Sequence, residues 1–317
     1  LVGMKASLTG DTLCDPKDPI VLERLEFPEP VITMSIEPRT NADKQRLSEA
    51  LGALRREDPS FRAAYDAETG QTIIAGMGEL HLEIVRNKLV RDMGLEVRVG
   101  RPRVAYRETI EAAAEAEGRF IRQTGGRGQF AVVDLRVEPW PTDPGEDPIV
   151  FEDATRGGPV PREFIPAVEQ GVRDAATGGP LAGYPVLHVK ATLTDGKHHP
   201  VDSSDLAFQQ AGALAFTQAL EKGRPAFLEP IMRLSVSTPE EYLGSVTADL
   251  NARRAEIKHM DQRGRYRVLT AEVPLAEMFG YSTQLRSMTQ GRATSSMEPH
   301  TYAHAPEQVK EALLRSV

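Results

Sequence analysis

The residues best suited to a chemical role lie in a glycine-rich stretch near the middle of the chain. It contains Gly125, Gly126, Arg127, Gly128 and Gln129. Glycine tolerates positive φ angles and leaves room for close approach to the backbone. Exposed backbone amides beside an arginine suit a phosphate backbone, and residues 119–136 hold four Arg against one Asp. The alternative is an ordinary glycine-rich hairpin turn with surface arginines.

A second unusual loop, Asp195–Val201, follows a strand that is expected to end near Thr194 and contains Lys197, His198 and His199. Neighbouring side chains in an extended loop diverge, so we do not expect the two histidines to bind one metal ion. At a strand–loop–helix junction they are placed to donate hydrogen bonds to ribose or phosphate oxygens. The alternative is a solvated polar turn. Both stretches are candidates for contact with a ribose or phosphate backbone, and we assign no catalytic and no metal-binding residues.

The composition is that of an ordinary cytoplasmic protein. The 317 residues carry a net charge of −8, and 40% of them are hydrophobic. No apolar run approaches the roughly 20 residues that a membrane helix needs, and a lone Cys14 excludes a disulfide framework within the chain. Because phosphate-loop, zinc-protease and serine-hydrolase motifs are absent, we expect this chain to bind no cofactor. Glu79, His81 and Glu83 lie two residues apart, so on a helix they cannot converge on a metal ion.

The pattern of strands and helices predicts a multidomain α+β protein. Residues 26–101 follow the order β-α-β-β-α-β, which is typical of a ferredoxin-like domain, and residues 227–304 repeat that order. Residues 102–226 form a different, mixed domain between them. Its long helix runs from Ser203 to Lys222, with alanines four apart that predict a flat face for close packing. Asp202 is expected to cap this helix.

Six segments of the chain, taken in order, resemble the C-terminal part of elongation factor G, the ribosomal translocase. They are Gly70–Glu83, Gly125–Gln129, Gly179–Pro185, Val201–Ser204, Leu228–Met232 and Val273–Tyr281. Because long motifs match in the same order, the resemblance covers nearly the whole chain.

The resemblance implies a domain assignment. Residues 1–25 would be the tail of the β-barrel domain II, and residues 26–101 the ferredoxin-like domain III. Residues 102–226 would be domain IV, whose fold is like domain 2 of ribosomal protein S5, and residues 227–304 the ferredoxin-like domain V. Residues 305–317 would form a terminal helix that packs on domain IV.

The resemblance also implies a function. The domain IV loops, here 125–129 and 197–199, would form a tip that enters the small-subunit decoding site and contacts the backbone of the tRNA–mRNA minihelix. Domain V would meet the large-subunit sarcin–ricin RNA, which fits the eight Lys and Arg against five Asp and Glu in residues 251–300. GTP hydrolysis with magnesium would belong to a G domain that this chain lacks. We expect a monomer whose partner is the ribosome and which contacts no membrane.

Two departures from the family pattern leave the cellular role open. Gln129 is followed by Phe130-Ala-Val, without the His that the family commonly carries there, and Lys197-His198-His199-Pro200 lacks the usual acidic residue after the His. One alternative is therefore a paralogue specialised for ribosome recycling. Another is a free-standing ribosome-binding module without GTPase activity.

Overall fold

The computed structural model describes residues 12, 14, 15, 17, 18, 20, 30, 32–40, 43–67, 69–77, 79–122, 128–142 and 146–316. Two compact units make up the chain, one of residues Leu1–Ala105 with Met232–Glu298 and one of Tyr106–Ile231 with Pro299–Val317. The expected β-barrel tail at residues 1–25 lies almost wholly outside the described residues. No helix in the described part is long and apolar enough to cross a membrane.

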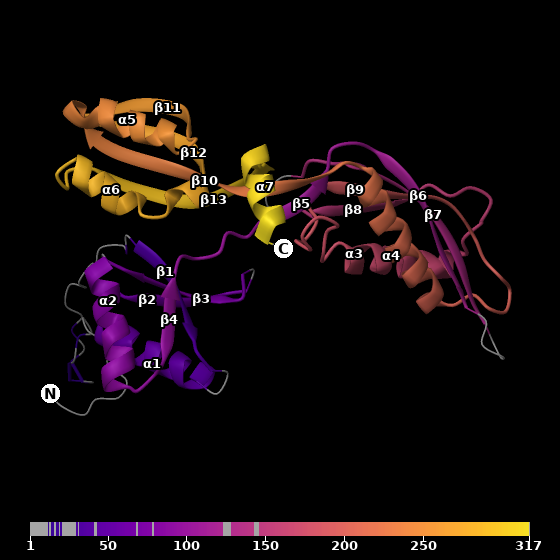
Figure 1. The fold of residues 1–317 in the computed structure, drawn as a ribbon, viewed down its shortest axis with the longest axis horizontal. Helices are drawn as coiled ribbons and strands as arrows, with labels where there is room; N and C mark the ends of the chain where they lie inside the picture. The colour runs from indigo at the N-terminus through magenta and orange to yellow at the C-terminus, as the bar shows by residue number, and fades with distance from the viewer. Residues whose placement is uncertain are drawn as a thin grey trace. The chain divides into compact units, whose positions relative to one another are not determined.

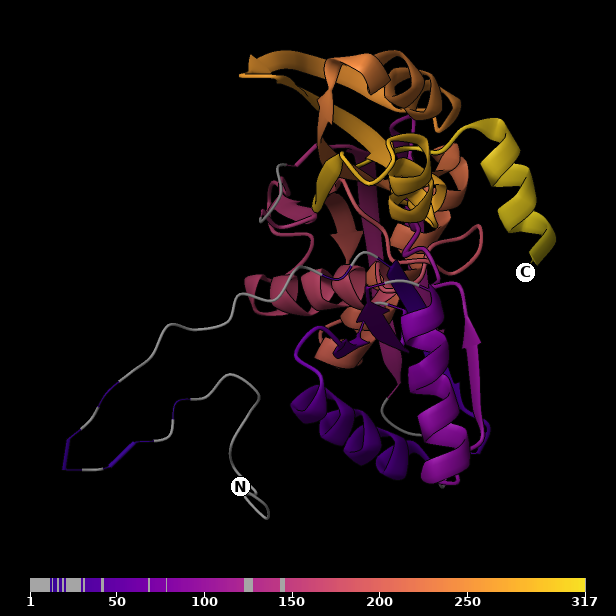
Figure 2. The ribbon, with the colours of Figure 1, turned by 90° about the vertical axis from the view of Figure 1, so that its left-hand side faces the viewer.

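The first domain has the predicted ferredoxin-like topology (Figure 1). Its elements are β1 (Ile32–Pro38), α1 (Asp43–Glu57), β2 (Arg62–Asp66), β3 (Gln71–Gly76), α2 (Glu79–Asn87) with a π-helical turn at Lys88–Asp92, and β4 (Val97–Gly100). The strands lie in the order β2-β3-β1-β4, and every pairing is antiparallel. Helices α1 and α2 lie next to each other in both ribbon views (Figures 1 and 2) and contribute Leu47 and Leu82 to one core.

A second domain repeats this arrangement. Its elements are β10 (Pro225–Pro239), α5 (Leu243–Ala252), β11 (Glu256–Arg263), β12 (Tyr266–Pro274), α6 (Tyr281–Met288) and β13 (Thr294–His304). The strand order β11-β12-β10-β13 is that of the first domain. The predicted fold class, an α+β chain with two ferredoxin-like domains around a different middle, is therefore confirmed.

The middle domain is a four-stranded sheet with helices on one face (Figure 1). Its elements are β5 (Arg107–Ile110), β6 (Ala114–Arg122), β7 (Gln129–Pro139), β8 (Ile149–Asp153), α3 (Ile165–Ala175), β9 (Val189–Lys197) and α4 (Asp205–Lys222). The sheet order is β6-β7-β9-β8, while β5 pairs with β10 instead.

Helix α4 packs closely on the sheet. The predicted alanine face is buried, since Ala207, Ala211, Ala215 and Ala219 are all 0% exposed. A Cβ atom on Gly118 of β6 would lie 2.0 Å from the Ala211 carbonyl oxygen. Only glycine therefore permits this approach between strand and helix.

Strand β9 is longer than the sequence pattern predicted. It continues past Thr194 to Lys197, because Asp195, Gly196 and Lys197 pair with β7 residues Asp134, Val133 and Val132. Pairing with a neighbouring strand stabilises these polar residues in an extended conformation that their own β propensity does not favour. The extension carries the second loop to the same end of the sheet as the β6–β7 connection.

The C-terminal helix α7 (Glu307–Ser316) belongs to the same compact unit as residues Tyr106–Ile231. Its apolar side chains Val309 and Leu313 are half-buried, and Leu314 remains 44% exposed. The helix therefore buries less apolar area than a helix of a domain core.

At the opposite end of the middle domain from the β6–β7 connection, Glu108 of β5 is a fully buried carboxylate. Its oxygens accept hydrogen bonds from the backbone N–H groups of Leu181 (2.7 Å), Ala182 (2.8 Å) and Tyr184 (3.1 Å). A Cβ atom on Gly179 would collide with this carboxylate. The glycine and the glutamate together hold the loop at residues 179–185 against β5.

We predict that Glu108→Ala destabilises the middle domain by about 3 kcal/mol or more, because each buried N–H left without an acceptor costs roughly 1–3 kcal/mol. Urea unfolding followed by fluorescence of Trp140, the single tryptophan of the chain, reports on this domain. The exposed Glu221→Ala variant is the control and should unfold like the unsubstituted chain. Equal midpoints for the two variants would contradict the role of Glu108.

Candidate nucleic-acid interface

The structure places Gly128 and Gln129, the described end of the first predicted stretch, beside the second stretch. Gln129 opens β7, Lys197 ends β9, and His198 and His199 follow before α4 begins. Gly128 lies directly before β7. Gly125, Gly126 and Arg127 lie outside the described residues, so their predicted role remains a prediction.

Asp202 joins the two stretches. Its carboxylate oxygen Oδ1 accepts a hydrogen bond from the Gly128 N–H at 3.0 Å, and its carbonyl oxygen accepts one from the Phe130 N–H at 2.9 Å. A Cβ atom on Gly128 would lie 3.2 Å from the Asp202 carboxyl carbon. Glycine at this position therefore allows the two backbones to approach each other.

The prediction that Asp202 caps α4 is wrong. The capping residue is Ser204, whose backbone is extended and whose hydroxyl oxygen accepts the Ala207 N–H at 3.2 Å. Both residue types cap helices well. Ser204 is the cap because the Asp202 carboxylate already accepts the hydrogen bond from Gly128. That bond depends on the position of β7 and not on the local sequence.

Ser203 adds a second connection between the stretches. Its buried hydroxyl accepts a hydrogen bond from the His199 N–H at 2.9 Å and donates one to the Phe130 carbonyl oxygen at 2.8 Å. Sequence analysis did not assign a role to Ser203 or Ser204. The feature of the sequence that could have indicated their roles is the run of three short polar residues, Asp202, Ser203 and Ser204, because a helix cap requires only one such residue.

The ring of His199 is oriented by the backbone that follows it. Its Nδ1 atom accepts hydrogen bonds from the N–H groups of Val201 (3.3 Å) and Asp202 (3.2 Å). The Asp202 carboxylate also lies 3.4 Å from Nδ1, but that contact is an ion pair only when the ring is protonated. Two N–H groups aimed at Nδ1 make it an acceptor in the neutral ring, which leaves the proton on Nε2.

Gln129 is held by the helix cap. Its side-chain oxygen Oε1 accepts a hydrogen bond from the Ser204 hydroxyl at 2.6 Å. The side chain is half-buried, and its Nε2 has no hydrogen-bond partner among the residues that the structure describes. The Phe130 ring lies 6.1 Å from that of His199, so the aromatic residue next to Gln129 packs on the second loop.

His198 and Lys197 have different surroundings. The Nδ1 atom of His198 lies 3.1 Å from the Pro159 carbonyl oxygen, which ties this ring to the segment before α3. Lys197 is exposed and has no ion-pair partner in the described part of the chain. The two histidines thus have separate partners, and the described residues contain no group of three or more His, Cys, Asp or Glu that is arranged to hold a metal ion.

Charge is arranged in rows across the helix-free face of the sheet. The row nearest the loops contains Arg119 and Lys197 on either side of Val132, and the next contains Glu117, Asp134 and Asp195 on adjacent strands. Burial raises the pKa of Asp134, and the charges of Glu117 and Asp195 raise it further, while Lys197 opposes the shift.

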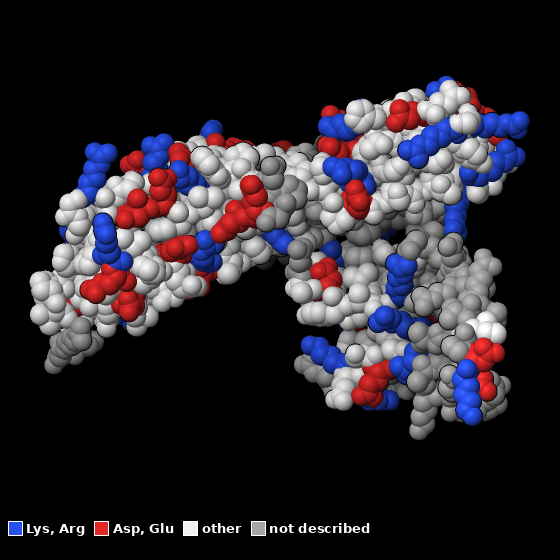
Figure 3. Space-filling model, turned by 180° about the vertical axis from the view of Figure 1, so that it is seen from behind, with Lys and Arg blue, Asp and Glu red and all other residues white. Residues whose placement is uncertain are grey.

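Figure 3 shows acidic and basic side chains interspersed over the middle domain, so any positive contact surface there is local.

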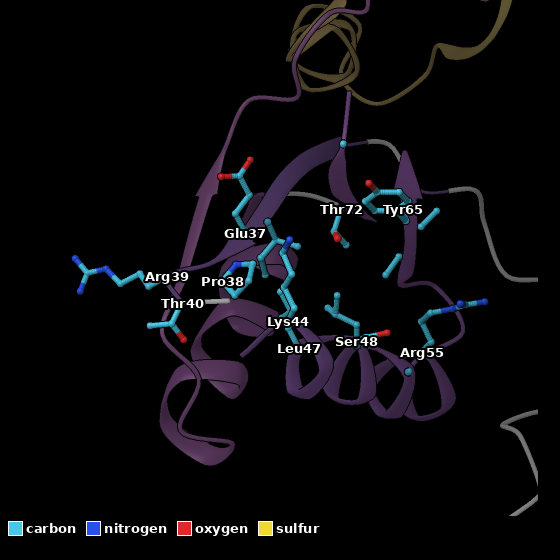
Figure 4. A pocket seen from close by; sticks show the side chains of 16 residues that line it. Glu37, Pro38, Arg39, Thr40, Lys44, Leu47, Ser48, Arg55, Tyr65 and Thr72 are labelled. Carbon is cyan, nitrogen blue, oxygen red and sulfur yellow. The ribbon is translucent and has the colours of Figure 1, made fainter. Parts of the chain in front are cut away.

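A cavity of about 810 Å³ lies in the first domain beside α1. Leu47 and Leu51 form part of its apolar lining. Figure 4 shows Lys44 reaching into the cavity, while Arg39 points away from it. Because Lys44 and Arg39 point in different directions, they do not converge on a common ligand. The two joined loops are therefore the stronger candidate for a functional site.

Comparison with known proteins identifies the family. Residues 27–101 match the model of "Elongation Factor G, domain III", residues 102–224 that of "Elongation factor G, domain IV" and residues 226–313 that of "Elongation factor G C-terminus". The chain belongs to the elongation factor G family. Both joined loops lie in the segment that matches domain IV, so the resemblance predicted from six motifs is confirmed.

Similar proteins agree with this assignment. The chain is 54% identical to elongation factor G of Thermotoga neapolitana, over 100% of this chain and 45% of that protein. It is 52% identical to elongation factor G of Fervidobacterium nodosum, over 99% of this chain and 45% of that protein. A crystal structure of a Thermus thermophilus protein superposes with a TM-score of 0.81 at 41% identity, covering 92% of this chain and 43% of that one. The chain therefore spans less than half the length of the elongation factor G relatives that it matches.

The hydrogen bonds around His199 predict the state of its ring in this member of the elongation factor G family. In the neutral ring, nitrogen-15 NMR should show a protonated Nε2 and an unprotonated Nδ1. The exposed His259 of β11 serves as the reference ring. A protonated Nδ1 in neutral His199 would contradict the geometry.

The raised pKa of Asp134 predicts a pH-dependent stability. Folded Asp134 holds its proton more tightly than unfolded Asp, so its contribution to stability falls as pH rises from the ordinary Asp pKa of about 3.9 through the folded pKa. Asp134→Asn should therefore raise the melting temperature at neutral pH, and the difference should vanish in acid below that ordinary value. The control Glu163→Gln should show no such dependence. Destabilisation by Asp134→Asn at neutral pH would contradict the electrostatic argument.

Proposed function

We propose that this chain is the C-terminal part of a ribosomal translocase and that its domain IV tip, formed by residues 125–129 and 197–199, contacts RNA in the decoding site. The observation that supports this most strongly is the joining of Gln129 and His199 on one surface through Asp202, Ser203 and Ser204. Family membership supports a role in translation. GTP and magnesium would be bound by a G domain outside this chain, and the ribosome would be the partner.

The chemistry of the tip suits the backbone of the tRNA–mRNA minihelix. An A-form RNA helix offers a wide, shallow minor groove lined with 2′-hydroxyl groups, which proteins recognise through shape and hydrogen bonds. A factor that acts on every codon requires contacts that do not depend on base sequence. Gln129 and His199 supply neutral hydrogen-bonding groups, and Lys197 supplies a positive charge for phosphate. Domain V would contact the sarcin–ricin RNA of the large subunit.

The test is single-round translocation by a full-length factor in which this chain follows the N-terminal segment of Thermotoga neapolitana elongation factor G that it does not cover. Gln129→Ala and His199→Ala should each slow translocation by roughly 2- to 12-fold, because each removes a hydrogen bond of about 0.5–1.5 kcal/mol in the transition state. Ribosome-stimulated GTP hydrolysis should stay unchanged, because the substitutions lie outside the G domain.

Gln210→Ala, an exposed glutamine on α4, is the matched control and should translocate at the rate of the unsubstituted factor. Ribosome splitting measured in parallel tests the recycling alternative, which predicts that splitting slows while translocation does not. If both tip variants translocate and split ribosomes at full speed, the proposed RNA contact is wrong.

A further inference from the structure

The Ser204 hydroxyl determines which end of the Gln129 amide faces outward. The Ser204 oxygen already accepts the Ala207 N–H as the cap of α4, so its own proton is available for donation. That proton goes to Gln129 Oε1 across 2.6 Å. The acceptor end of the amide is thereby occupied, and the donor end, Nε2, is left without a partner among the described residues.

His199 also uses its acceptor atom internally and leaves its donor atom without a partner in the described part of the chain, although its partners are backbone groups. Its acceptor atom, Nδ1, receives two backbone N–H groups, from Val201 and Asp202. Its Nε2 has no hydrogen-bond partner in the described part of the chain, and in the neutral ring that atom carries the proton. Two side chains that contain both donors and acceptors therefore each use the acceptor internally.

We propose that Ser204 and the backbone N–H groups of residues 201 and 202 position Gln129 and His199 so that both side chains present hydrogen-bond donors outward. Such a surface binds ligands rich in acceptors, namely phosphate and 2′-hydroxyl oxygens, and does not pair with the amino groups of bases. This inference rests on the proposed function, because it specifies the chemistry of that same contact. An amide that is held in one orientation also loses less conformational freedom on binding than one that rotates.

Ser204 can be tested without removing the helix cap. Thr and Asp both cap helices, but they differ toward Gln129. The Ser204→Thr variant keeps a hydroxyl that accepts from Ala207 and donates to Gln129. In Ser204→Asp the carboxylate only accepts, so the Gln129 amide must turn its Nε2 inward and present Oε1 to the RNA.

The experiment compares Ser204→Thr with Ser204→Asp in the full-length fusion described above, each with Gln129 and with Gln129→Ala. With Gln129 present, we expect the Ser204→Thr factor to translocate about 5- to 30-fold faster than the Ser204→Asp factor. In Ser204→Asp the Gln129 donor is lost to the RNA, and Gln129 Oε1 faces acceptor oxygens of the RNA instead. With Gln129→Ala the ratio should fall to about threefold or less, since only the screened effect of the added charge remains. Thermal unfolding should show the domain folded in all four proteins.

Three results would overturn the inference. An equal ratio in both backgrounds would mean that Ser204 acts through charge or folding and not through Gln129, although the tip could still contact RNA. Full activity of Ser204→Asp with Gln129 present would mean that the orientation of the amide does not matter. Full activity of Gln129→Ala would mean that Gln129 makes no productive contact with RNA, whereas the proposed function fails only if His199→Ala is fully active as well.

Discussion

The candidate site depends on one short hydrogen-bonded segment, Asp202-Ser203-Ser204, which lies between the second loop and α4. Each residue of the segment contacts the start of β7, through Gly128, Phe130 and Gln129 respectively. Without these bonds the two loops would be independent connections at the end of a sheet. With them, side chains about 70 residues apart in sequence form one surface, and the backbone of one loop orients the side chains of the other.

The middle domain can support this segment because α4 lies unusually close to the sheet. The alanine face of α4 and Gly118 of β6 bring helix and strand backbones nearly into contact, and close-packed interiors transmit such constraints because they deform little. The start of the helix is therefore fixed relative to the ends of β6 and β7. A larger residue at position 118 would displace α4, and with it Asp202 and Ser204, although it lies far from these two residues in sequence.

Much of this architecture follows from local patterns in the sequence. The β-α-β-β-α-β order of two domains and the alanine face of α4 were predictable, because hydrophobic periodicity and turn residues determine them. The proximity of Gln129 to the second loop was implied only by the resemblance to elongation factor G. The capping residue of α4 could not be predicted from local patterns, because Asp202 and Ser204 are equally good capping residues and only the position of β7 decides between them. The extension of β9 to Lys197 likewise depends on pairing with β7, which a single-strand pattern does not contain. The orientation of the Gln129 amide depends on the Ser204 hydroxyl, whose oxygen also accepts the Ala207 N–H at the start of α4.

If the joined surface presents donors to the RNA backbone, electron cryomicroscopy of the full-length fusion, trapped on a ribosome carrying tRNA and mRNA, should show both Nε2 atoms at the RNA. We expect Gln129 Nε2 and His199 Nε2 within about 3.2 Å of phosphate or ribose oxygens, with Ser204 still bonded to Gln129 Oε1. A complex in which both side chains face solvent or protein, or in which Gln129 Oε1 faces the RNA, would contradict it.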